Sequence, residues 1–481
     1  MSDQPALLRL GLAAGSLAPA RQATLLQGMA TRRRQLSLTL CDTDNRRFAA
    51  AGWLCLAGRP GQNPEILPAA GIGLAAAPPL ATGIALEGLA ELRRSAQAGQ
   101  VRRDGYEIGI EIAKLVLRAD GRRAEAGEIL LQGPAGAGPV LNALAAELCT
   151  DLPLRWSGPA PVVHLAVALG LIEPQPQRAG TIPFDLGDDS EAASAFGAIL
   201  RHCLLQFDAN LVPALRDCDT EGVHQMRVAL RRLRSALGLF APMLREDMLD
   251  PLVEELRWIN GPLGRKRDLD VFLAETLSPL RRELDDVKAL QHLRIILEDH
   301  REAAQVALVS ALQSPRLAAL RLGFARLADA VEDGSALADA AMAAQPAERF
   351  AAEVLRKRRR KVKALGMQHA ELPIESLHEL RIRAKKLRYA AEFFRSLFGR
   401  KDTRRFIAAL GRLQDCLGVL NDADVGVRLV RDLLPDAGHG TATAAITAWF
   451  AGRQQLQLAQ LGDAWDDFAA IRPFWKDALK D

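Results

Sequence analysis

Long apolar runs and paired cysteines are both scarce in this sequence. The longest apolar run, Ala160 to Ile172, is too short to cross a bilayer and contains His164. Six cysteines are scattered through 481 residues without a Cys-x-x-Cys pair. This pattern predicts free thiols in a reducing compartment rather than a zinc site or a disulfide framework. The start, MSDQPALLRL, has no cationic segment before its apolar residues. We therefore expect a cytoplasmic protein without a membrane span, a bound metal or a cofactor.

Charge is unevenly distributed along the chain. The net charge is only +4, but residues 356–405 hold 17 Lys and Arg against 5 Asp and Glu, a balance of +12, so the remainder totals 4 − 12 = −8. Such segregation indicates either a polyanionic partner or a strongly solvated helix face. Taken alone, a basic run is more often a solvated face, so the spacing of the charges has to decide.

The stretch from Val223 to Phe240 has helical periodicity in two properties at once. Its apolar residues recur every three or four positions, which places them on one face of a helix: Met226, Leu230, Leu233, Leu237 and Phe240. Cationic residues recur at the same rhythm on a neighbouring strip, at His224, Arg227, Arg231 and Arg234. Because the strip lies beside the apolar face and not opposite it, we expect it to face a groove between helices.

The same stretch occurs twice. Six residues that begin at His224 return from His378 onward, 154 residues later (378 − 224). A second motif, Leu263-Gly264 followed by Arg267-Asp268-Leu269-Asp270, returns at Leu417-Gly418 with Asn421-Asp422-Ala423-Asp424 at the same offset (418 − 264). Two motifs in one register indicate an internal duplication.

The four matched motifs resemble the CHAD domain, the conserved-histidine α-helical domain. His-x-x-Arg with a following basic cluster, then Leu-Gly-x-x-x-Asp-x-Asp, occurs twice in a chain that is helical from about Ser190 to Asp481. The resemblance implies two pseudo-symmetric helical halves with a basic surface that binds inorganic polyphosphate. It also implies an association with polyphosphate granules or phosphate storage.

The residues that we expect to bind polyphosphate follow from this duplication. Arg suits the task because its planar fork can bind two phosphate oxygens at once. The candidates are His224, Arg227, Arg231, Arg232, Arg234, Arg265, Arg267, Arg356, Arg359, Arg360, Lys363, His378, Arg381, Lys385, Lys386 and Arg388. For the two histidines, an ordinary first-turn hydrogen bond is as good an explanation as direct phosphate contact.

Nucleic acid is the competing polyanion, and it is not favoured. Single-stranded nucleic acid is bound by bases stacking on aromatics. Aromatics form only 5% of this chain, and Tyr389 alone lies within the basic strips. An adaptor for acidic proteins is a further alternative, and the oligomeric state is left open. For the acidic residues of the second motif, helix capping together with orientation of the Arg residues is preferred over cation binding.

Residues 1–172 have a different character. Short alternating segments such as Tyr106 to Ile112, separated by turn signals such as Asp120-Gly121, predict a mostly antiparallel β domain. Residues 173–189 are rich in Pro and polar residues and predict a linker. The expected fold is therefore multidomain α+β, with a β domain and then an all-α domain of two repeats at about 190–335 and 345–481.

The β domain resembles the CYTH or triphosphate-tunnel fold. The matching pieces are Leu40 to Asp44, Ala51-Gly52, Gly127 to Ile129 and Ala135-Gly136. The family's first strand carries Glu-x-Glu-x-Lys, and residues Leu7 to Gly11 supply neither the carboxylates nor the Lys. A tunnel without metal-binding carboxylates should not hydrolyse triphosphate. We expect a degenerate scaffold and no enzyme, with a metal-dependent inorganic triphosphatase as the alternative.

Helical spacing and proline positions predict the extent of the helices. They are expected at about 191–217, 220–241, 246–261, 268–284, 286–312, 315–331, 347–365, 374–398, 402–418, 422–433 and 441–470.

Overall fold

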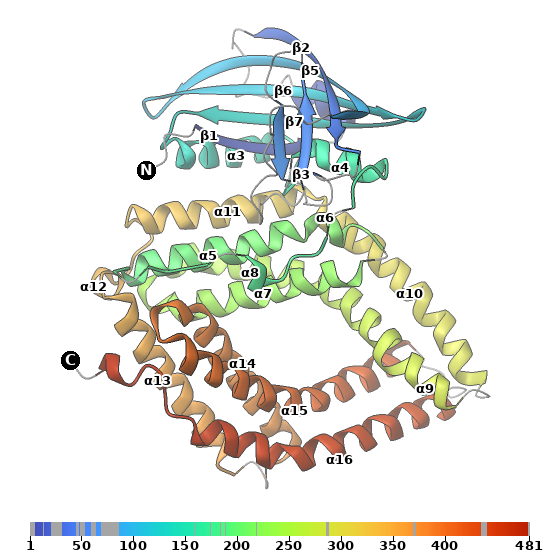
Figure 1. Ribbon diagram of the computed structural model, residues 1–481, viewed down its shortest axis with the longest axis vertical. Coiled ribbons are helices and arrows are strands. Elements are labelled where there is room, and N and C mark those ends of the chain that lie inside the picture. Colours follow the sequence, from blue (N-terminus) through green and yellow to red (C-terminus); the bar gives the residue numbers. More distant parts are fainter. Residues whose placement is uncertain are drawn as a thin grey trace.

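The computed structural model of the chain describes most of its 481 residues. They are residues 5–12, 14–20, 31–44, 48, 53–58, 64–68, 86–158, 160–173, 175–182, 184–187, 189–217, 219–284, 288–368, 372–433 and 440–479. The Ala51-Gly52 motif lies outside them. A β-sheet occupies one end of the molecule, and helices make up the rest (Figure 1).

The sheet is formed entirely by antiparallel pairs among its strands. Its order is β4-β3-β2-β5-β6-β7-β1-β8. The strands are β1 (Ala6–Leu12), β2 (Arg32–Asp42), β3 (Trp53–Ala57), β4 (Glu65–Pro68), β5 (Glu87–Arg103), β6 (Tyr106–Ala119), β7 (Arg122–Gly133) and β8 (Leu154–Arg155). This curled eight-stranded sheet agrees with the expected tunnel-like domain.

Each end of the sheet is covered by a different helix. Ile108, Ile110 and Ile112 of β6 are buried in a cluster that includes α3 (Gly138–Asp151). Further along β6 the buried residues are Leu115 and Leu117, which belong to a second cluster with α4 (Pro161–Ala168). The change from even to odd positions means that opposite faces of the strand are covered at its two ends. We call the face of β6 that carries the odd-numbered residues, Glu111 among them, the inner face of the sheet.

The helical region follows the sheet and is arranged in two halves that repeat the same motifs. The helices of the first half include α5 (Ala192–Ala209), α6 (Leu211–Ala214), α7 (Thr220–Phe240), α8 (Glu246–Val271), α9 (Ser278–Glu283), α10 (Lys288–Leu312) and α11 (Pro315–Glu332). Those of the second half include α12 (Ala340–Ala343), α13 (Ala347–Gly366), α14 (Ile374–Phe393), α15 (Arg400–Leu433) and α16 (Gly440–Ala470).

The two halves meet in one shared hydrophobic core. Phe240 at the end of α7 contacts Phe350 of α13, with ring centroids 4.9 Å apart, and also contacts Phe394 at 6.1 Å. Phe394 is the repeat copy of Phe240, because 394 − 240 is again 154. The predicted bundles are therefore packed into one body, and α7 lies against α14 at the centre.

The apolar stripe of α7 is buried as the sequence predicts. Met226, Leu230, Leu233, Leu237 and Phe240 are all no more than 4% exposed. Asp219 caps the helix, and its side chain accepts a hydrogen bond from the backbone N–H of Gly222 at 2.8 Å. Anchoring from this side fixes the rotation of α7 and so the direction of its cationic strip.

Two of the predicted helix breaks are wrong. Helix α8 continues through Pro262 to Val271, where a π-helical turn (η5, Phe272–Leu277) begins, and α15 continues through residues 418–422. An interior proline costs about 3 kcal/mol locally. Burial of Ile259 and Leu263 on either side of it opposes that cost. Arg267 and Asp268 therefore lie inside a continuous helix, and the capping interpretation is wrong.

The predicted linker is packed against the helical region. The backbone N–H of Gln177 donates to the side chain of Asn210 at 2.8 Å, and Asn210 donates back to the Gln177 carbonyl at 2.8 Å. Ile182 and Leu186 are buried. The segment is thus held in a defined path along α5 and reaches the 3-10 turn after α14 (η6, Arg395–Leu397), where the Leu186 N–H donates to Ser396 Oγ.

The sheet is joined to the helices through a polar and aromatic contact. Asp208 of α5 accepts hydrogen bonds from Trp156 at 2.8 Å and from Arg321 of α11, whose guanidinium also lies over the indole ring at 4.7 Å. Nearby, Asn142 of α3 donates to Asp329 of α11 at 2.9 Å. Helix α11 is therefore the platform on which α3 and the sheet rest (Figure 1).

Two features expected from composition can be compared with the described residues. None of their helices is long and apolar enough to cross a membrane. Cys41, Cys55, Cys149, Cys203 and Cys416 are free thiols, whereas Cys218 lies outside the described residues.

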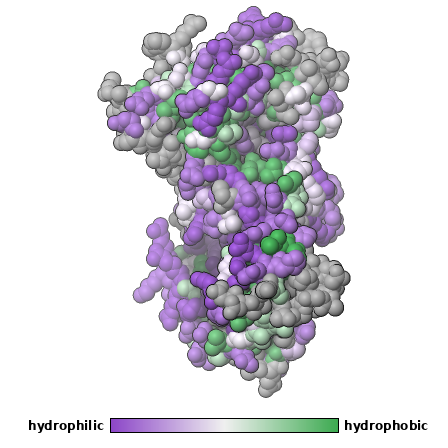
Figure 2. All heavy atoms as spheres, turned by 90° about the vertical axis from the view of Figure 1, so that its right-hand side faces the viewer, coloured by the Kyte–Doolittle hydropathy of each residue, from purple (hydrophilic) through white to green (hydrophobic). Residues whose placement is uncertain are grey.

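On the face seen in Figure 2, the coloured atoms are mostly hydrophilic with smaller apolar patches between them.

Gly222 provides a test of how α7 is positioned. A Cβ at this residue would lie 2.7 Å from Pro213 Cβ and 2.8 Å from the Ala214 backbone N, so the α6 segment would have to move. We expect Gly222→Ala to lower the free energy of unfolding by about 1–3 kcal/mol in a denaturant titration.

Gly238 in the same helix is the matched control, because nothing lies within 4 Å of a Cβ placed there. Gly238→Ala should raise stability by up to about 1 kcal/mol through helix propensity. Equal effects of the two substitutions would contradict the close approach of α6 to α7.

Candidate anion-binding cleft

A cleft of about 1310 Å³ lies between the two halves of the helical region. One wall is α7, the other is formed by α14 and α15, and the linker contributes Gly180, Phe184 and Asp185. Nine Lys and Arg line it, against four Asp and Glu. The cations are Arg231, Arg232, Arg381, Lys385, Arg388, Arg395, Arg400, Arg404 and Arg453.

Arg231 is the α7 cation that is best placed to receive a ligand. Its side chain is half-buried in the cleft wall, and its buried Nε has no hydrogen-bond partner among the described residues. An unmade hydrogen bond at a buried donor costs about 1–3 kcal/mol. A bound anion that accepted this hydrogen bond would remove the penalty.

Arg227 is held behind the cleft by the second repeated motif. Its Nη1 donates to the Gly264 carbonyl at 2.7 Å and to Asp268 at 3.0 Å. A Cβ at Gly264 would approach this guanidinium to 3.4 Å, so the glycine permits the contact. The orientation of an Arg by the acidic motif is therefore confirmed for Asp268, whereas the side chains of Asp422 and Asp424 lie outside the described residues.

Asp270 of the same motif serves a separate ion network. It is 4% exposed and lies 2.6 Å from Lys266 and 3.3 Å from Arg301. Lys266 is itself fully buried. This carboxylate therefore neutralises the buried Lys266 and the half-buried Arg301, which connects α8 to α10, and it is not among the residues that line the cleft.

Glu392, which lines the cleft, joins cations from both halves. Its carboxylate lies 2.8 Å from Arg388 Nε and 3.7 Å from Arg232 Nη1. Arg232 is 7% exposed and also lies over the Phe393 ring at 5.1 Å. Arg232 thus connects α7 to α14, and its charge is largely compensated inside the protein.

The structure brings together six of the sixteen candidate residues in this cleft. They are His224, Arg231, Arg232, Arg381, Lys385 and Arg388. Lys385 is the repeat copy of Arg231, so this pair provides equivalent cations from the two walls. Lys386, the copy of Arg232, lines a different cavity on another side of α14.

The remaining candidates lie outside the cleft lining. Arg359 donates to the carbonyls of Ala469 and Ile471 at 3.3 and 2.9 Å, and so anchors α13 to the end of α16. Arg267 lies 3.9 Å from Glu275. Arg234, Arg265, Arg356, Arg360 and His378 are exposed, and Lys363 is half-buried on α13.

Several residues of the cleft are absent from the sequence-based set. Arg395, Arg400 and Arg404 belong to the strongly basic stretch 356–405, so local charge could have identified them. Arg453 of α16 and His202 of α5 carry no such signal, because α16 and α5 fold against the cleft from distant parts of the sequence.

Two histidines in the cleft are shifted away from protonation. Burial, followed by the charge of Arg267, lowers the pKa of His224 to about 4. Burial, together with Arg232 and Arg395, lowers the pKa of His202 to about 4. Both rings are therefore neutral near pH 7, and an anion placed among these cations would favour their charged forms.

The inner face of the sheet holds the acidic residues of the triphosphatase alternative. Both oxygens of the buried Glu128 are occupied: Arg9 lies 3.4 Å from one and Arg94 3.2 Å from the other. Glu111 contacts Arg94 at 2.6 Å and Arg34 at 3.0 Å. Within the described residues, no group of three or more His, Cys, Asp and Glu could hold a metal ion.

Comparison with known proteins gives matches for the helical region. Residues 198–431 match the family model for the CHAD domain. The crystal structure of the CHAD domain from the plant Ricinus communis is 29% identical, with a TM-score of 0.55, over 62% of this chain and 98% of that chain. PptA from Streptomyces chartreusis is 20% identical, with a TM-score of 0.41, over 58% and 98%. Among curated proteins no match is found.

Removal of the Glu392 charge tests its role between the halves. In Glu392→Gln the mostly buried Arg232 loses its carboxylate, so we expect the free energy of unfolding to fall by about 1–3 kcal/mol. The exposed pair of Glu254 and Arg257 supplies the control. Glu254→Gln should change stability by less than about 1 kcal/mol. If Glu392→Gln lowers the free energy of unfolding by as little in chemical denaturation, the pairing of Glu392 with Arg232 does not stabilise the contact between the halves.

Proposed function

We propose that the protein binds inorganic polyphosphate non-covalently in the cleft, because residues 198–431 match the model of the CHAD domain, a family associated with polyphosphate. The observation that carries the proposal is the pairing of Arg231 and Lys385, equivalent residues of the two repeats, on opposite walls of one basic cavity. A linear polyphosphate carries negative charge at every unit, and it can contact both walls at once.

The composition of the cleft favours polyphosphate over nucleic acid. Phe184 and Tyr389 are the only Phe, Tyr or Trp among its lining residues. Phe184 already packs on His202, with ring centroids 4.5 Å apart, and Tyr389 is half-buried. Successive bases would therefore find little aromatic surface for stacking. A chain of phosphates requires only cations and hydrogen-bond donors.

Binding should depend on both charge and geometry. Carboxylates hold Arg232 and Arg388, so part of the positive charge is compensated before any ligand arrives. The buried Arg231 Nε has no hydrogen-bond partner within the described part of the chain. Because Arg232 and Arg388 are held by carboxylates while, among the described residues, Arg231 is not, Arg231 remains available to donate a hydrogen bond to an anion in the cleft. In the cell, such binding would place the protein on polyphosphate granules or link it to phosphate storage.

The β-sheet fits a scaffold in this proposal. The carboxylates of Glu128 and Glu111 are paired with Arg side chains, so a metal ion would have to displace these cations first. The metal-dependent triphosphatase therefore has no observation in its favour. Release of phosphate from tripolyphosphate with Mg²⁺ or Mn²⁺, abolished by Glu128→Gln, would establish it.

A double substitution tests the two walls together. We expect Arg231→Ala/Lys385→Ala to weaken binding of long-chain polyphosphate about 10- to 100-fold at low salt, because two charge-assisted contacts are lost. The slope of log affinity against log salt should become shallower by about two. Fluorescence anisotropy with labelled polyphosphate measures both quantities.

Arg356→Ala/Arg360→Ala is the control of equal charge, since both residues are exposed and outside the cleft. It should change affinity by less than about threefold, which corresponds to the weak effect of exposed charges. Equal losses in the two double variants would refute the cleft as the site. Equal affinity for single-stranded DNA of the same charge would refute the preference for polyphosphate.

Protonation of His224 gives a second test of the same site. Its pKa in the free protein is about 4, and a bound polyanion should raise it. Binding then takes up a proton between pH 4 and the raised value, so affinity should increase as the pH falls from 7.5 to 5.5. Titrations at constant ionic strength measure this slope.

The repeat copy supplies the control for the histidine. His378 is exposed and does not line the cleft. His224→Gln should flatten the pH dependence, whereas His378→Gln should leave it unchanged. An unaltered slope in His224→Gln would show that other groups take up the proton.

A further inference from the structure

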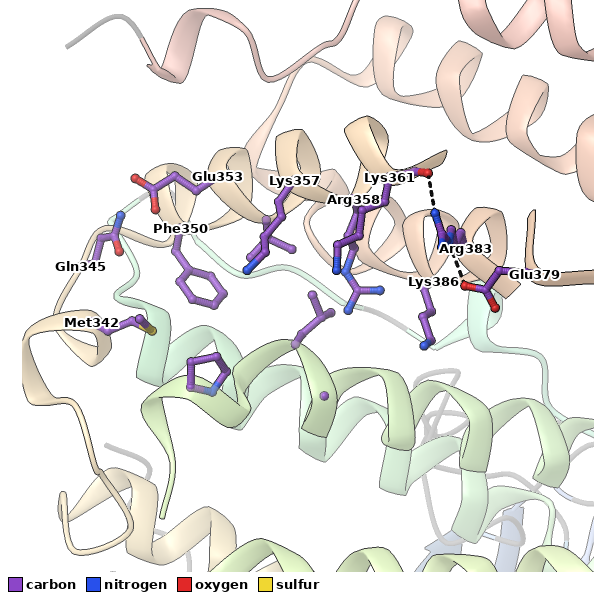
Figure 3. A pocket seen from close by; sticks show the side chains of 14 residues that line it. Met342, Gln345, Phe350, Glu353, Lys357, Arg358, Lys361, Glu379, Arg383 and Lys386 are labelled. Atoms are coloured by element: carbon purple, nitrogen blue, oxygen red, sulfur yellow. Dashed lines mark hydrogen bonds and ion pairs between the residues drawn. The ribbon is translucent and has the colours of Figure 1, made fainter. Parts of the chain in front are cut away.

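A second cavity lies on another side of α14, separate from the cleft. Its volume is about 550 Å³, and it is enclosed by α13, α14 and the end of α7 (Figure 3). It shares no lining residue with the cleft. This size is typical of pockets that bind small molecules.

One wall of the cavity is cationic. Arg358 and Lys386 point into it from α13 and α14, and Lys357 and Lys361 line the same side (Figure 3). Among the described residues these four cations have no carboxylate partner. The two acidic residues of the lining are already engaged, because Glu379 lies 2.7 Å from Arg383 and Glu353 lies 3.7 Å from Arg349.

Arg358 is the least compensated of these cations. It is half-buried on α13, and burial alone lowers its pKa to about 10. Other half-buried or buried Arg residues nearby are bonded, as Arg359 is to two carbonyls and Arg232 is to Glu392. A desolvated guanidinium without a partner reduces stability. The cost is understandable where a ligand supplies the missing acceptor.

The other wall is apolar and adjoins the cationic one, since Phe350 and Val354 precede Arg358 on α13. It also includes Leu239, Pro242 and Met342. Phe350 is 5% exposed and is stacked on Phe240, so its position is fixed. A bare phosphate chain would leave this wall uncovered, whereas a ligand with both an anionic and an apolar end would contact both walls.

We propose that this cavity binds a small amphipathic organic phosphate, with the phosphate groups toward Arg358 and Lys386 and the apolar part against Phe350 and Val354. The apolar part is either a base, as in a nucleoside polyphosphate, or a short aliphatic chain. This site goes beyond the proposed function, since neither its residues nor its ligand are those of the cleft.

Three probes separate the contributions of the two walls. ATP without divalent cations carries both ends, tripolyphosphate carries only the charge, and hexyl phosphate replaces the base with an aliphatic chain. We expect calorimetry to show that ATP or hexyl phosphate binds more tightly than its inorganic counterpart of similar charge, which is tripolyphosphate for ATP and orthophosphate for hexyl phosphate. Whichever of the two binds identifies the apolar part.

Arg358→Gln tests the cationic wall. It should weaken binding of the organic probe by about tenfold or more. The melting temperature of the free protein should stay equal or rise, because an uncompensated charge is removed. Arg356→Gln, exposed on the same helix and outside the cavity, should leave binding unchanged. If Arg358→Gln lowers the melting temperature, the exposed Lys357→Gln takes its place and should still weaken binding.

The outcome is independent of the cleft. The affinity of Arg231→Ala/Lys385→Ala for the organic probe should be unchanged even where its affinity for polyphosphate falls. The affinity of Arg358→Gln for polyphosphate should be unchanged. Tripolyphosphate that binds as tightly as ATP, together with orthophosphate that binds as tightly as hexyl phosphate, would overturn the amphipathic site. Loss of the organic probe in the cleft variant, or an equal loss in Arg356→Gln, would also overturn it.

Discussion

The carboxylate of Glu392 is the interaction on which the arrangement of the two halves depends. Helices α7 and α14 each bring a row of cations toward the same cleft, and like charges at close range repel. Glu392 lies between Arg232 of one helix and Arg388 of the other. Because it compensates one cation from each half, the helices can remain packed around Phe240 and Phe394 while Arg231 stays directed into the cleft.

In the β-sheet, too, opposite charges compensate one another, but there the buried groups are carboxylates and the compensating groups are Arg side chains. On its inner face Glu128 and Glu111 are the groups that need compensation, and Arg9, Arg34 and Arg94 provide it. Desolvation lowers the pKa of a guanidinium, but in Arg94 the carboxylates outweigh it and the pKa is raised. The absence of the Glu-x-Glu-x-Lys pattern was readable from residues 7–11. The pairing of Glu128 and Glu111 with Arg side chains was not, because it depends on register between distant strands.

The sequence was sufficient for the repeated helices but not for all their boundaries. Periodicity identifies the buried stripe of α7 because its apolar residues all fall on the same face of the helix, and that face is buried. Local signals fail at Pro262 and near Gly418, where tertiary packing maintains one helix across residues that usually end one. The repeat offset nevertheless identified the two motifs that meet in the structure, since Arg227 of the first motif bonds to Gly264 and Asp268 of the second.

The fate of each cation could not be predicted, for a geometric reason. Adjacent residues on a helix are separated by about 100°, so Lys385 faces the cleft while Lys386 faces the second cavity. Arg231 and Arg232 both line the cleft, but only Arg232 is also held by Glu392 and Phe393. His224 is half-buried whereas its copy His378 is exposed. Internal duplication therefore preserves the position of a residue on its helix, but the neighbours that fold against that helix decide whether its charge supports the fold or remains for a ligand.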